Sequence, residues 1–155
     1  AWLSGFLGKP VRLLYCGDQS NRRMRSQPEQ ALSFADAYPL LLIGQGSLDE
    51  LNRRIGRELS MSRFRPNLVV TGAEPFAEDG WKRIRIGSTV LRIEKPCERC
   101  VFTTVDPDSG EKTADQEPLR TLAKFRKTAA GVLFGQNLLV EQAGEIACGM
   151  EVEIL

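Results

Sequence analysis

Short apolar runs broken by Gly, Pro and polar residues recur along the chain, and this pattern predicts many short strands. At residues 11–15 the alternation places Val11, Leu13 and Tyr15 on one face. Continuous apolar runs predict buried strands at residues 40–43, 68–71 and 138–140. Alternating charged and apolar residues predict a further strand at 151–154, near the end of the chain.

A hairpin is predicted over residues 81–94, where apolar residues alternate with polar ones on both sides of a Gly87-Ser88 turn. The following stretch, residues 96–110, is expected to be irregular, with a strand-like run at 101–105. A polar loop is expected at residues 17–28, which contain an arginine-rich group.

Two segments carry helical patterns. The first helix is expected to open at Ser47, because Ser47 and Glu50 have the S-x-x-E spacing of a capping box. The second is expected to begin at Pro118, since proline is favoured in the first turn of a helix. The predicted inward faces consist of Leu48, Leu51, Ile55 and Leu59 in the first helix and Leu119, Leu122 and Phe125 in the second.

These elements together favour a mainly β domain, α+β by content, with a barrel-like or folded sheet and a few peripheral helices. The length of 155 residues corresponds to one domain. A net charge of +1 is too balanced for nucleic-acid binding by bulk electrostatics. No run approaches the roughly 18 apolar residues of a membrane-spanning helix, so neither nucleic acid nor membrane is an expected partner.

The content of histidine and cysteine narrows the chemistry further. The chain has no histidine, which excludes Ser-His-Asp and Cys-His catalysis from its own residues and any zinc site that needs imidazole. Its four cysteines, at positions 16, 97, 100 and 148, are too sparse for a secreted disulfide scaffold and favour the cytosol. Any chemistry must therefore depend on a thiolate, a carboxylate, Lys or Arg, or a cofactor.

Cys97 and Cys100 form a C-x-x-C motif whose spacing admits several interpretations. The pair could be half of a Cys₄ zinc site, although the other half is missing. It could be a thioredoxin-like redox pair, although a strand-like run rather than a helix follows it. One cysteine could instead be a lone thiolate ligand to a soft metal cofactor. The alternative without function is a pair of small, buried apolar side chains.

Other residues carry a possible binding role beside a structural one. Arg65, between Phe64 and Pro66, could bind phosphate or carboxylate from a rigid turn, and Asn67 could contact a polar heterocycle. A surface ion pair and a strand-start Asn are the structural alternatives.

The remaining candidates are weaker on residue pattern alone. Gly46-Ser47 could form an anion site or simply a helix cap. Residues 106–110 have a turn composition, although their two carboxylates could act as acid and base. Residues 134–137 could let the backbone approach a ligand closely or could simply enter a strand. The arginines at 22–25 and 53–57 could form a docking patch for an acidic redox partner or ordinary solvated faces.

The motifs, taken in order, resemble those of the MOSC domain (molybdenum cofactor sulfurase C-terminal domain). The most specific are R-F-R-P-N at 63–67 and C-x-R-C-x-x-T-T-V-D-P-x-x-G at 97–110. The resemblance spans residues 38–155 and also fits 6–11. Further matching segments are Tyr38-Pro39 with 40–43, Ser47-Leu48 with Leu51-Asn52, 77–79 with Trp81, 117–122 and 134–136.

Within this family the chain resembles the mitochondrial amidoxime-reducing components and their bacterial relatives that detoxify N-hydroxylated bases. This resemblance implies a MOSC-type folded sheet and a molybdenum cofactor, with Cys100 as the protein ligand to molybdenum. It implies that Arg65 and Asn67 contact the pterin, and the match extends this expectation to Ser47, Glu98 and Gln136.

The sequence departs from that branch at two points. Glu98 stands two residues before the expected ligand, where the vertebrate enzymes have Ser, so its carboxylate is expected either to point away from the cofactor or to change the pocket. These proteins carry an N-terminal β-barrel domain that supplies further basic cofactor-binding residues, and this chain is expected to lack it. The chain is therefore expected to be the MOSC core of a longer protein, without any C-terminal 2Fe–2S domain, and to bind the cofactor weakly or not at all alone.

Two functions are compatible with the resemblance. The first is reduction of small N-hydroxylated substrates on a molybdenum cofactor, with electrons from an iron–sulfur or flavin protein or domain. The second is a non-catalytic module that carries sulfur as a persulfide on Cys100 or binds pyridoxal phosphate. A pyridoxal phosphate enzyme needs a desolvated lysine, and every candidate stands in a polar context: Lys82, Lys95, Lys112, Lys124 and Lys127.

Overall fold

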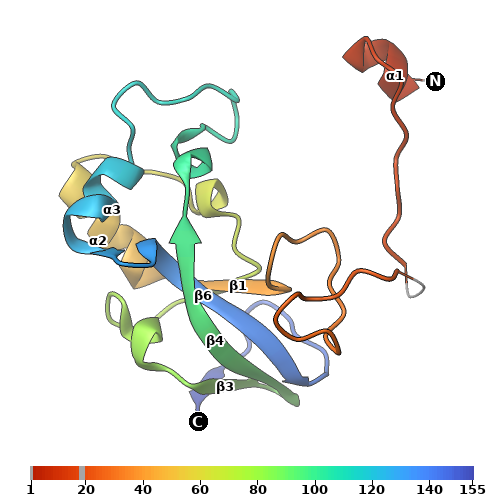
Figure 1. Ribbon diagram of the computed structural model, residues 1–155. Helices are drawn as coiled ribbons and strands as arrows, with labels where there is room; N and C mark the ends of the chain where they lie inside the picture. Colours follow the sequence, from red (N-terminus) through yellow and green to blue (C-terminus); the bar gives the residue numbers. More distant parts are fainter. Residues whose placement is uncertain (1, 18–19) are drawn as a thin grey trace. The chain divides into compact units, whose positions relative to one another are not determined.

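The computed structural model describes residues 2–17 and 20–155, and the chain divides into two compact units, residues 1–37 and 38–155 (Figure 1). The first unit begins with helix α1 (Trp2–Leu7), which has no buried residue. The other described residues of this unit, 8–17 and 20–37, form no regular element except a short antiparallel bridge between Arg23 and Ala31. Positions 18 and 19 of the predicted loop 17–28 lie outside the described residues.

The predicted strand at 11–15 is wrong. This segment has no regular structure, and the side chains of Leu13 and Tyr15 are almost fully exposed. Its alternating pattern could form a strand only beside a partner, because an isolated strand is not stable in water. No other described segment of the chain pairs with it.

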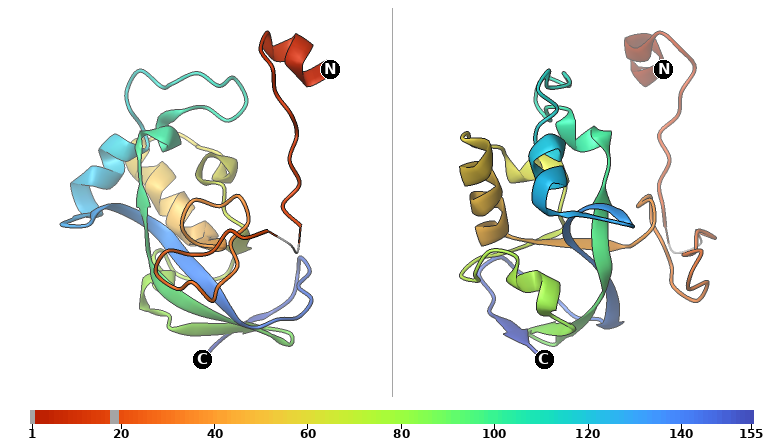
Figure 2. Two further views of the ribbon diagram at one scale, coloured as in Figure 1. Left: turned by 45° about the vertical axis from the view of Figure 1, so that its right-hand side comes forward. Right: turned by 60° about the vertical axis from the view of Figure 1, so that its left-hand side comes forward.

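The second unit is built on one sheet with the strand order β2-β1-β6-β4-β3-β7, and β5 pairs with β6. All neighbouring strands are antiparallel except β1 and β2, which are parallel. Long strands β4 and β6 form its spine and bend through register shifts, which gives the barrel-like curvature visible in Figure 2. The strands are β1 (Leu40–Gly44), β2 (Leu68–Val70), β3 (Arg83–Ile86), β4 (Thr89–Arg99), β5 (Lys127–Thr128), β6 (Gly131–Gln142) and β7 (Val152–Ile154). The predicted β-rich class is confirmed.

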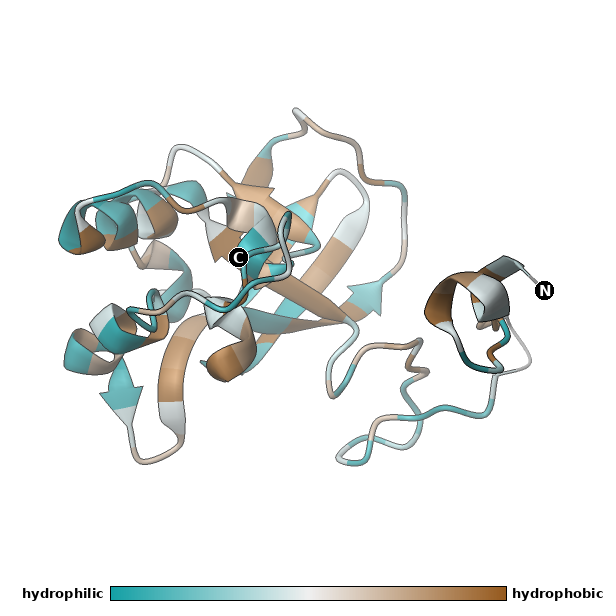
Figure 3. Ribbon diagram, turned by 90° about the horizontal axis from the view of Figure 1, so that it is seen from above, coloured by the Kyte–Doolittle hydropathy of each residue, from teal (hydrophilic) through white to brown (hydrophobic). Residues whose placement is uncertain are grey.

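Helices α2 (Gln45–Ile55) and α3 (Leu119–Phe125) pack together at one end of the sheet (Figures 1 and 2). In Figure 3 the turns of these helices alternate between apolar and polar residues, as expected for helices with one buried side. Short 3₁₀ helices connect the strands: η1 (Met61–Phe64), η2 (Ala77–Gly80) and η3 (Val101–Thr104). No described helix is long and apolar enough to cross a membrane.

Two apolar clusters lie on opposite sides of β1. Leu42 joins one of them, which also contains Trp81, Ile84 and Leu91. The neighbouring Ile43 points to the other side and joins the cluster under the helices, whose remaining buried members are Leu48, Leu51, Phe64, Leu122 and Phe134. Both faces of β1 are thus covered, which explains why its sequence is a continuous apolar run.

The predicted hairpin is confirmed, with β3 and β4 joined at Gly87-Ser88. Helix α2 was also predicted, but it begins at Gln45 and ends before Gly56, so Leu59 is buried outside it. Pro118 occupies the position just before α3 rather than its first residue.

The prediction for residues 96–105 needs correction at both ends. Strand β4 continues through Arg99, so Cys97 lies in a strand rather than in an irregular segment. The β-branched run that follows forms η3 instead of a strand. The Thr103 and Thr104 hydroxyls donate to the Cys100 and Val101 carbonyls three residues earlier, and these local bonds favour a tight turn.

Gly135 marks a close approach between two strands rather than between backbone and ligand. Its φ of +79° is unfavourable for other residues, and a Cβ there would lie 2.8 Å from the Leu42 carbonyl oxygen and 2.7 Å from Ile43. Glycine therefore lets β6 pass close to β1.

Candidate functional site

Cys100 stands at the point where β4 ends and η3 begins. Its backbone is extended, and its carbonyl accepts hydrogen bonds from the amide and the hydroxyl of Thr103. Its side chain is exposed, and no described residue donates to or accepts from its thiol. The backbone is therefore fixed while the sulfur remains available to a ligand.

The second cysteine of the motif has a different environment. Cys97 is half-buried, and its Sγ accepts a hydrogen bond of 3.1 Å from Nη1 of Arg99. Because residues 98 and 99 are extended, the Cα atoms of Cys97 and Cys100 are roughly 10 Å apart at about 3.3 Å per residue. A disulfide requires less than about 7 Å, so this geometry disfavours a redox pair.

The zinc interpretation also lacks support. Among residues 2–17 and 20–155, no group of three or more Cys, Asp or Glu side chains is arranged to hold a metal ion. A metal at Cys100 would therefore have to bring most of its ligands with it.

Arg65 follows η1 and has a left-handed backbone with a φ of +55°. Such a conformation is costly for a residue other than Gly, Asn or Asp, and it persists only where the surroundings impose it. The guanidinium is exposed and has no partner among the described residues. Strained backbone and an uncommitted cationic side chain are together typical of a binding residue.

Neighbours on both sides anchor this turn. The carbonyl of Phe64 accepts a hydrogen bond of 2.8 Å from Nη2 of Arg99. On the other side, the amide of Asn67 donates to the Leu41 carbonyl at 2.8 Å, and its Oδ1 accepts from the Leu41 amide at 2.9 Å. Asn67 thus extends the β1–β2 pairing through its side chain, which leaves only its exposed NH₂ group for a ligand.

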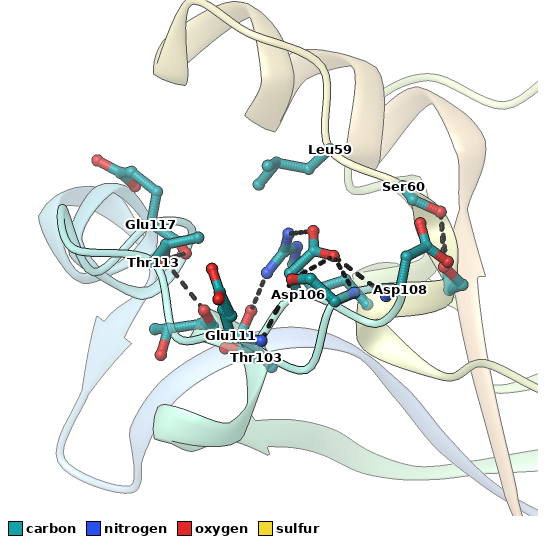
Figure 4. A network of polar contacts seen from close by, with 12 residues as sticks. Leu59, Ser60, Thr103, Asp106, Asp108, Glu111, Thr113 and Glu117 are labelled. Atoms are coloured by element: carbon teal, nitrogen blue, oxygen red, sulfur yellow. Dashed lines mark hydrogen bonds and ion pairs between the residues drawn. The ribbon is translucent and has the colours of Figure 1, made fainter.

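An ion pair between a buried arginine and a partly exposed carboxylate holds η1 against the segment after Cys100. The side chain of Arg63 is only 4% exposed and binds Asp106 at 2.8 Å. Its Nη1 also donates to the Thr103 carbonyl at 3.4 Å. Figure 4 shows the polar network around Asp106, which the amide and hydroxyl of Thr113 extend by donating to the Thr104 carbonyl.

Asp106 organises the predicted turn at 106–110. Its Oδ1 accepts hydrogen bonds from the amides of Ser109 and Asp108, and these bonds, with the Ser109 hydroxyl and Arg63, hold the pKa of Asp106 below its usual value. The carboxylate is thus committed to the turn and to Arg63. This explains the composition of the segment without an acid–base role.

A hollow of about 420 Å³ lies between η1 and the turn after η3. Arg65 lines it together with Phe102, which is 57% exposed, and with Val105. The hollow thus has one cationic wall and one apolar wall. Cys100 lies at the start of η3, two residues from Phe102.

The other predicted site residues are engaged elsewhere. Glu98 points to the opposite side of β4 from Arg99, beside Gly131, and forms an ion pair with Lys95 at 3.0 Å. This pairing raises the pKa of Lys95. The carboxylate of Glu98 therefore has a cationic partner, Lys95, on the surface of β4.

Ser47 and Gln136 are buried and support η2. Ser47 is not the helix cap that its sequence motif predicts. The structure places Gly44 at that position and Ser47 inside α2, where its hydroxyl donates to Glu78 at 2.7 Å. Gln136 donates to Asp79 at 2.7 Å. Glu50, the other half of the predicted capping box, pairs instead with Arg53 and Arg54, which lower its pKa to about 2.

The structure therefore brings Cys100 and Arg65 onto adjoining turns, with Asn67 beside Arg65, and leaves Ser47, Gln136 and Glu98 in other contacts. Residue-by-residue reasoning missed Arg63 and Arg99, which join those two turns. Both lie inside the motifs that carry the resemblance, and this was the signal that could have identified them.

The donor chemistry points to one class of ligand. One soft thiolate donor and one free guanidinium suit an anionic group that carries a metal with its own ligands. The Nε atoms of Arg63 and Arg99 are buried without a hydrogen-bond partner, and the charge of Arg63 is paired with Asp106 whereas Arg99 binds only Cys97 Sγ and the Phe64 carbonyl.

Comparison with known proteins identifies relatives over almost the whole chain. A family model described as the MOSC domain matches residues 29–153. Human mitochondrial amidoxime-reducing component 1 is 33% identical over 99% of this chain and 50% of its own length. Rice molybdenum cofactor sulfurase is 34% identical over 93% of this chain and 20% of its own length. The chain thus spans about half the length of the amidoxime-reducing component it matches.

A solved structure confirms the architecture. The crystal structure of YiiM from Geobacillus stearothermophilus matches with a TM-score of 0.54, covering 76% of this chain and 54% of that chain. At 18% sequence identity this likeness concerns the fold alone.

Proposed function

Because the chain belongs to the MOSC domain family, we propose that it binds a molybdenum cofactor and serves in the reduction of N-hydroxylated compounds, with Cys100 as the protein ligand to molybdenum. The observation that carries the proposal is the pairing of an uncommitted thiol with an uncommitted arginine on two turns that the protein holds together. The names of the relatives, which include amidoxime-reducing components, support the choice of reaction.

The residues present fit such a cofactor. Cys100 offers a soft sulfur donor without a competing hydrogen bond, and a pterin dithiolene would supply the further ligands that the described chain lacks. Arg65 suits the phosphate group of the pterin, and the NH₂ group of Asn67 suits an acceptor on the same molecule. When bound, the cofactor supplies a centre that exchanges two electrons.

The overall reaction is balanced by two electrons and two protons. An amidoxime, R–C(=NOH)NH₂, takes up both and gives the amidine, R–C(=NH)NH₂, and water, with cleavage of the N–O bond. The electrons come from an iron–sulfur or flavin partner. Since the chain contains no histidine, its own residues bind and orient the reactants, and we propose no histidine-based proton transfer.

Each site residue has a distinct role in this proposal. Cys100 binds the metal, Arg65 neutralises phosphate charge, and the exposed Phe102 beside Arg65 offers an apolar surface against which a bound molecule can exclude water. Protein groups that hold the cofactor at both ends fix its orientation relative to a bound substrate.

Metal and pterin analysis of the purified protein tests the ligand assignment. We propose that the chain is the MOSC part of a longer protein, so the whole protein should be used, with molybdenum cofactor supplied during expression. Cys100→Ala should lose most of its molybdenum. Cys97→Ala should keep it, and so should Cys148→Ala, a control whose cysteine is also exposed. Full molybdenum retention in Cys100→Ala would refute the assignment.

Activity can be tested on the same preparations with an aryl amidoxime and a chemically reduced electron donor. The wild-type protein should form amidine and water, and Cys100→Ala should not. A protein that holds molybdenum at Cys100 but reduces no N-hydroxylated compound would retain the cofactor assignment and overturn the reaction.

A sulfur-carrier function is the second candidate, because the exposed Cys100 could equally hold a persulfide and one relative is a molybdenum cofactor sulfurase. Mass spectrometry that finds an added sulfur on Cys100 in a metal-free protein would favour it. Pyridoxal phosphate binding has less support, because the lysines considered for it are all exposed: Lys82, Lys95, Lys112, Lys124 and Lys127. The cytosolic location stays a prediction, since the names of several relatives place those proteins in mitochondria.

A further inference from the structure

Arg99 makes contacts that link the two turns of the candidate site. From its place on β4, one residue before Cys100, its guanidinium reaches in two directions. Nη2 donates to the Phe64 carbonyl at 2.8 Å, and Nη1 donates to Cys97 Sγ at 3.1 Å. The guanidinium carbon also lies 5.3 Å from the centre of the Phe64 ring.

Phe64 is a rigid attachment point for this link. It is only 1% exposed, and its ring packs against Phe134 with centroids 4.6 Å apart. The carbonyl that Arg99 binds belongs to the peptide unit whose nitrogen is that of Arg65. The hydrogen bond therefore acts directly on the backbone that adopts the left-handed conformation.

Besides Arg99, one hydrogen bond within the turn holds that peptide unit among the described residues. The amide of Arg65 donates to Ser62 within the turn at 3.1 Å, and the next residue, Pro66, has no N–H. The firm connection to the sheet resumes only at Asn67, through its bonds to Leu41.

We propose that Arg99 is a positioning residue that fixes the turn bearing Arg65 relative to Cys100, so that one ligand can engage the thiolate and the guanidinium together. This inference rests on the proposed function for the nature of the ligand, but the mechanical link stands apart from it. Arg99 itself is engaged by protein groups through both Nη atoms, so it acts through Arg65 and Cys100 rather than on the ligand.

Amide hydrogen exchange in the metal-free protein tests the link without any cofactor. In Arg99→Gln, which loses the charged donor to Phe64, the Arg65 amide should exchange at least about tenfold faster. The Asn67 amide should be unchanged, because its bond to Leu41 does not involve Arg99. Arg99→Lys should be intermediate, since lysine keeps the charge but cannot span both partners in a fixed fork.

A matched control separates this local effect from a general loss of stability. Arg83 lies in the same sheet, and its guanidinium pairs with Glu141 on the surface. Arg83→Gln should leave the Arg65 amide unchanged. Equal acceleration in both variants, or an unchanged Arg65 amide in Arg99→Gln, would overturn the proposal.

The cofactor-loaded protein provides the second readout. Arg99→Gln should keep most of its molybdenum, because Cys100 is intact, while its Mo(V) electron paramagnetic resonance spectrum shifts and the KM for substrate changes less than kcat. Arg99→Lys should restore the wild-type spectrum in part. An unchanged spectrum in Arg99→Gln would refute the positioning role. Absence of molybdenum from the wild-type protein would instead refute the proposed function, and the exchange experiment would still decide the link.

Discussion

Glu78 is the residue whose replacement should affect the fold most directly. Its side chain is only 1% exposed and lies at the first turn of α2. One oxygen accepts from the Gly44 amide at 3.1 Å, and both oxygens lie within 2.9 Å of the Ser47 hydroxyl. A carboxylate from η2 therefore caps a helix more than thirty residues earlier in the chain.

The loss in free energy of unfolding expected for Glu78→Ala comes from the hydrogen-bond donors that the substitution leaves without an acceptor. The Gly44 amide and the Ser47 hydroxyl would both be buried without an acceptor, at about 1–3 kcal/mol each. Loss of a negative charge at the positive end of the helix adds about 0.3–1 kcal/mol. We expect a total of about 2–7 kcal/mol, a large share of the roughly 5–15 kcal/mol that stabilises a typical domain. Glu78→Gln keeps an acceptor and the shape, so it should cost about 1–2 kcal/mol.

Urea unfolding followed by circular dichroism measures these differences. Ser47→Ala should also destabilise the protein, and the double variant with Glu78→Ala should lose about 1–2 kcal/mol less than the sum of the single losses, because the two side chains share a hydrogen bond. A loss below about 1 kcal/mol in Glu78→Ala, or full additivity in the double variant, would refute this account of the cap.

Two further predictions concern the turn at Asp106 and the strand crossing at Gly135. The lowered pKa of Asp106 means that its ionised form contributes stability above its unfolded value of about 3.9, and that this contribution is lost as the pH falls below that value toward the folded pKa. Asp106→Asn should therefore be less stable than wild type at pH 7, and the gap should narrow in unfolding measurements at pH 3; a gap independent of pH would contradict this. Gly135→Ala should cost about 2 kcal/mol or more in urea unfolding, because its φ of +79° and the 2.8 Å approach to the Leu42 carbonyl are both unsuitable for a Cβ. Wild-type stability in that variant would show that β1 can move aside.

Local patterns identified the elements whose stability depends on neighbours in sequence. The hairpin was predictable because its alternation has the period of a strand and its turn residues lie between the two halves. Ser47 was misassigned because a capping motif considers only four adjacent residues, whereas its actual partner, Glu78, comes from another part of the chain. The run 101–105 was misassigned because β-branched residues favour strands only where a neighbouring strand is available.

The candidate site was predictable to a different extent. Motifs in the sequence predicted its position at Cys100 and Arg65, because a thiol and a guanidinium can be recognised as candidate binding groups from residue type alone. The links that hold them together, through Arg63 and Arg99, join segments about forty residues apart and could not be deduced from spacing. Neither could the left-handed backbone of Arg65, which depends on the contacts of its neighbours.

The extended end of β4 also bears on how the protein withstands oxidation. Because the strand keeps the two thiols of the C-x-x-C motif roughly 10 Å apart by Cα, an oxidant cannot convert them into an internal disulfide unless the last residues of β4 leave the sheet. In the folded state, oxidation of the exposed Cys100 thiol without Cys97 therefore requires an external disulfide, which exchanges with the thiol and releases one of its own thiols, or a small oxidant. How long the Cys100 thiol stays reduced during storage and assay then depends on the oxidants in the solution and on whether a ligand covers the sulfur.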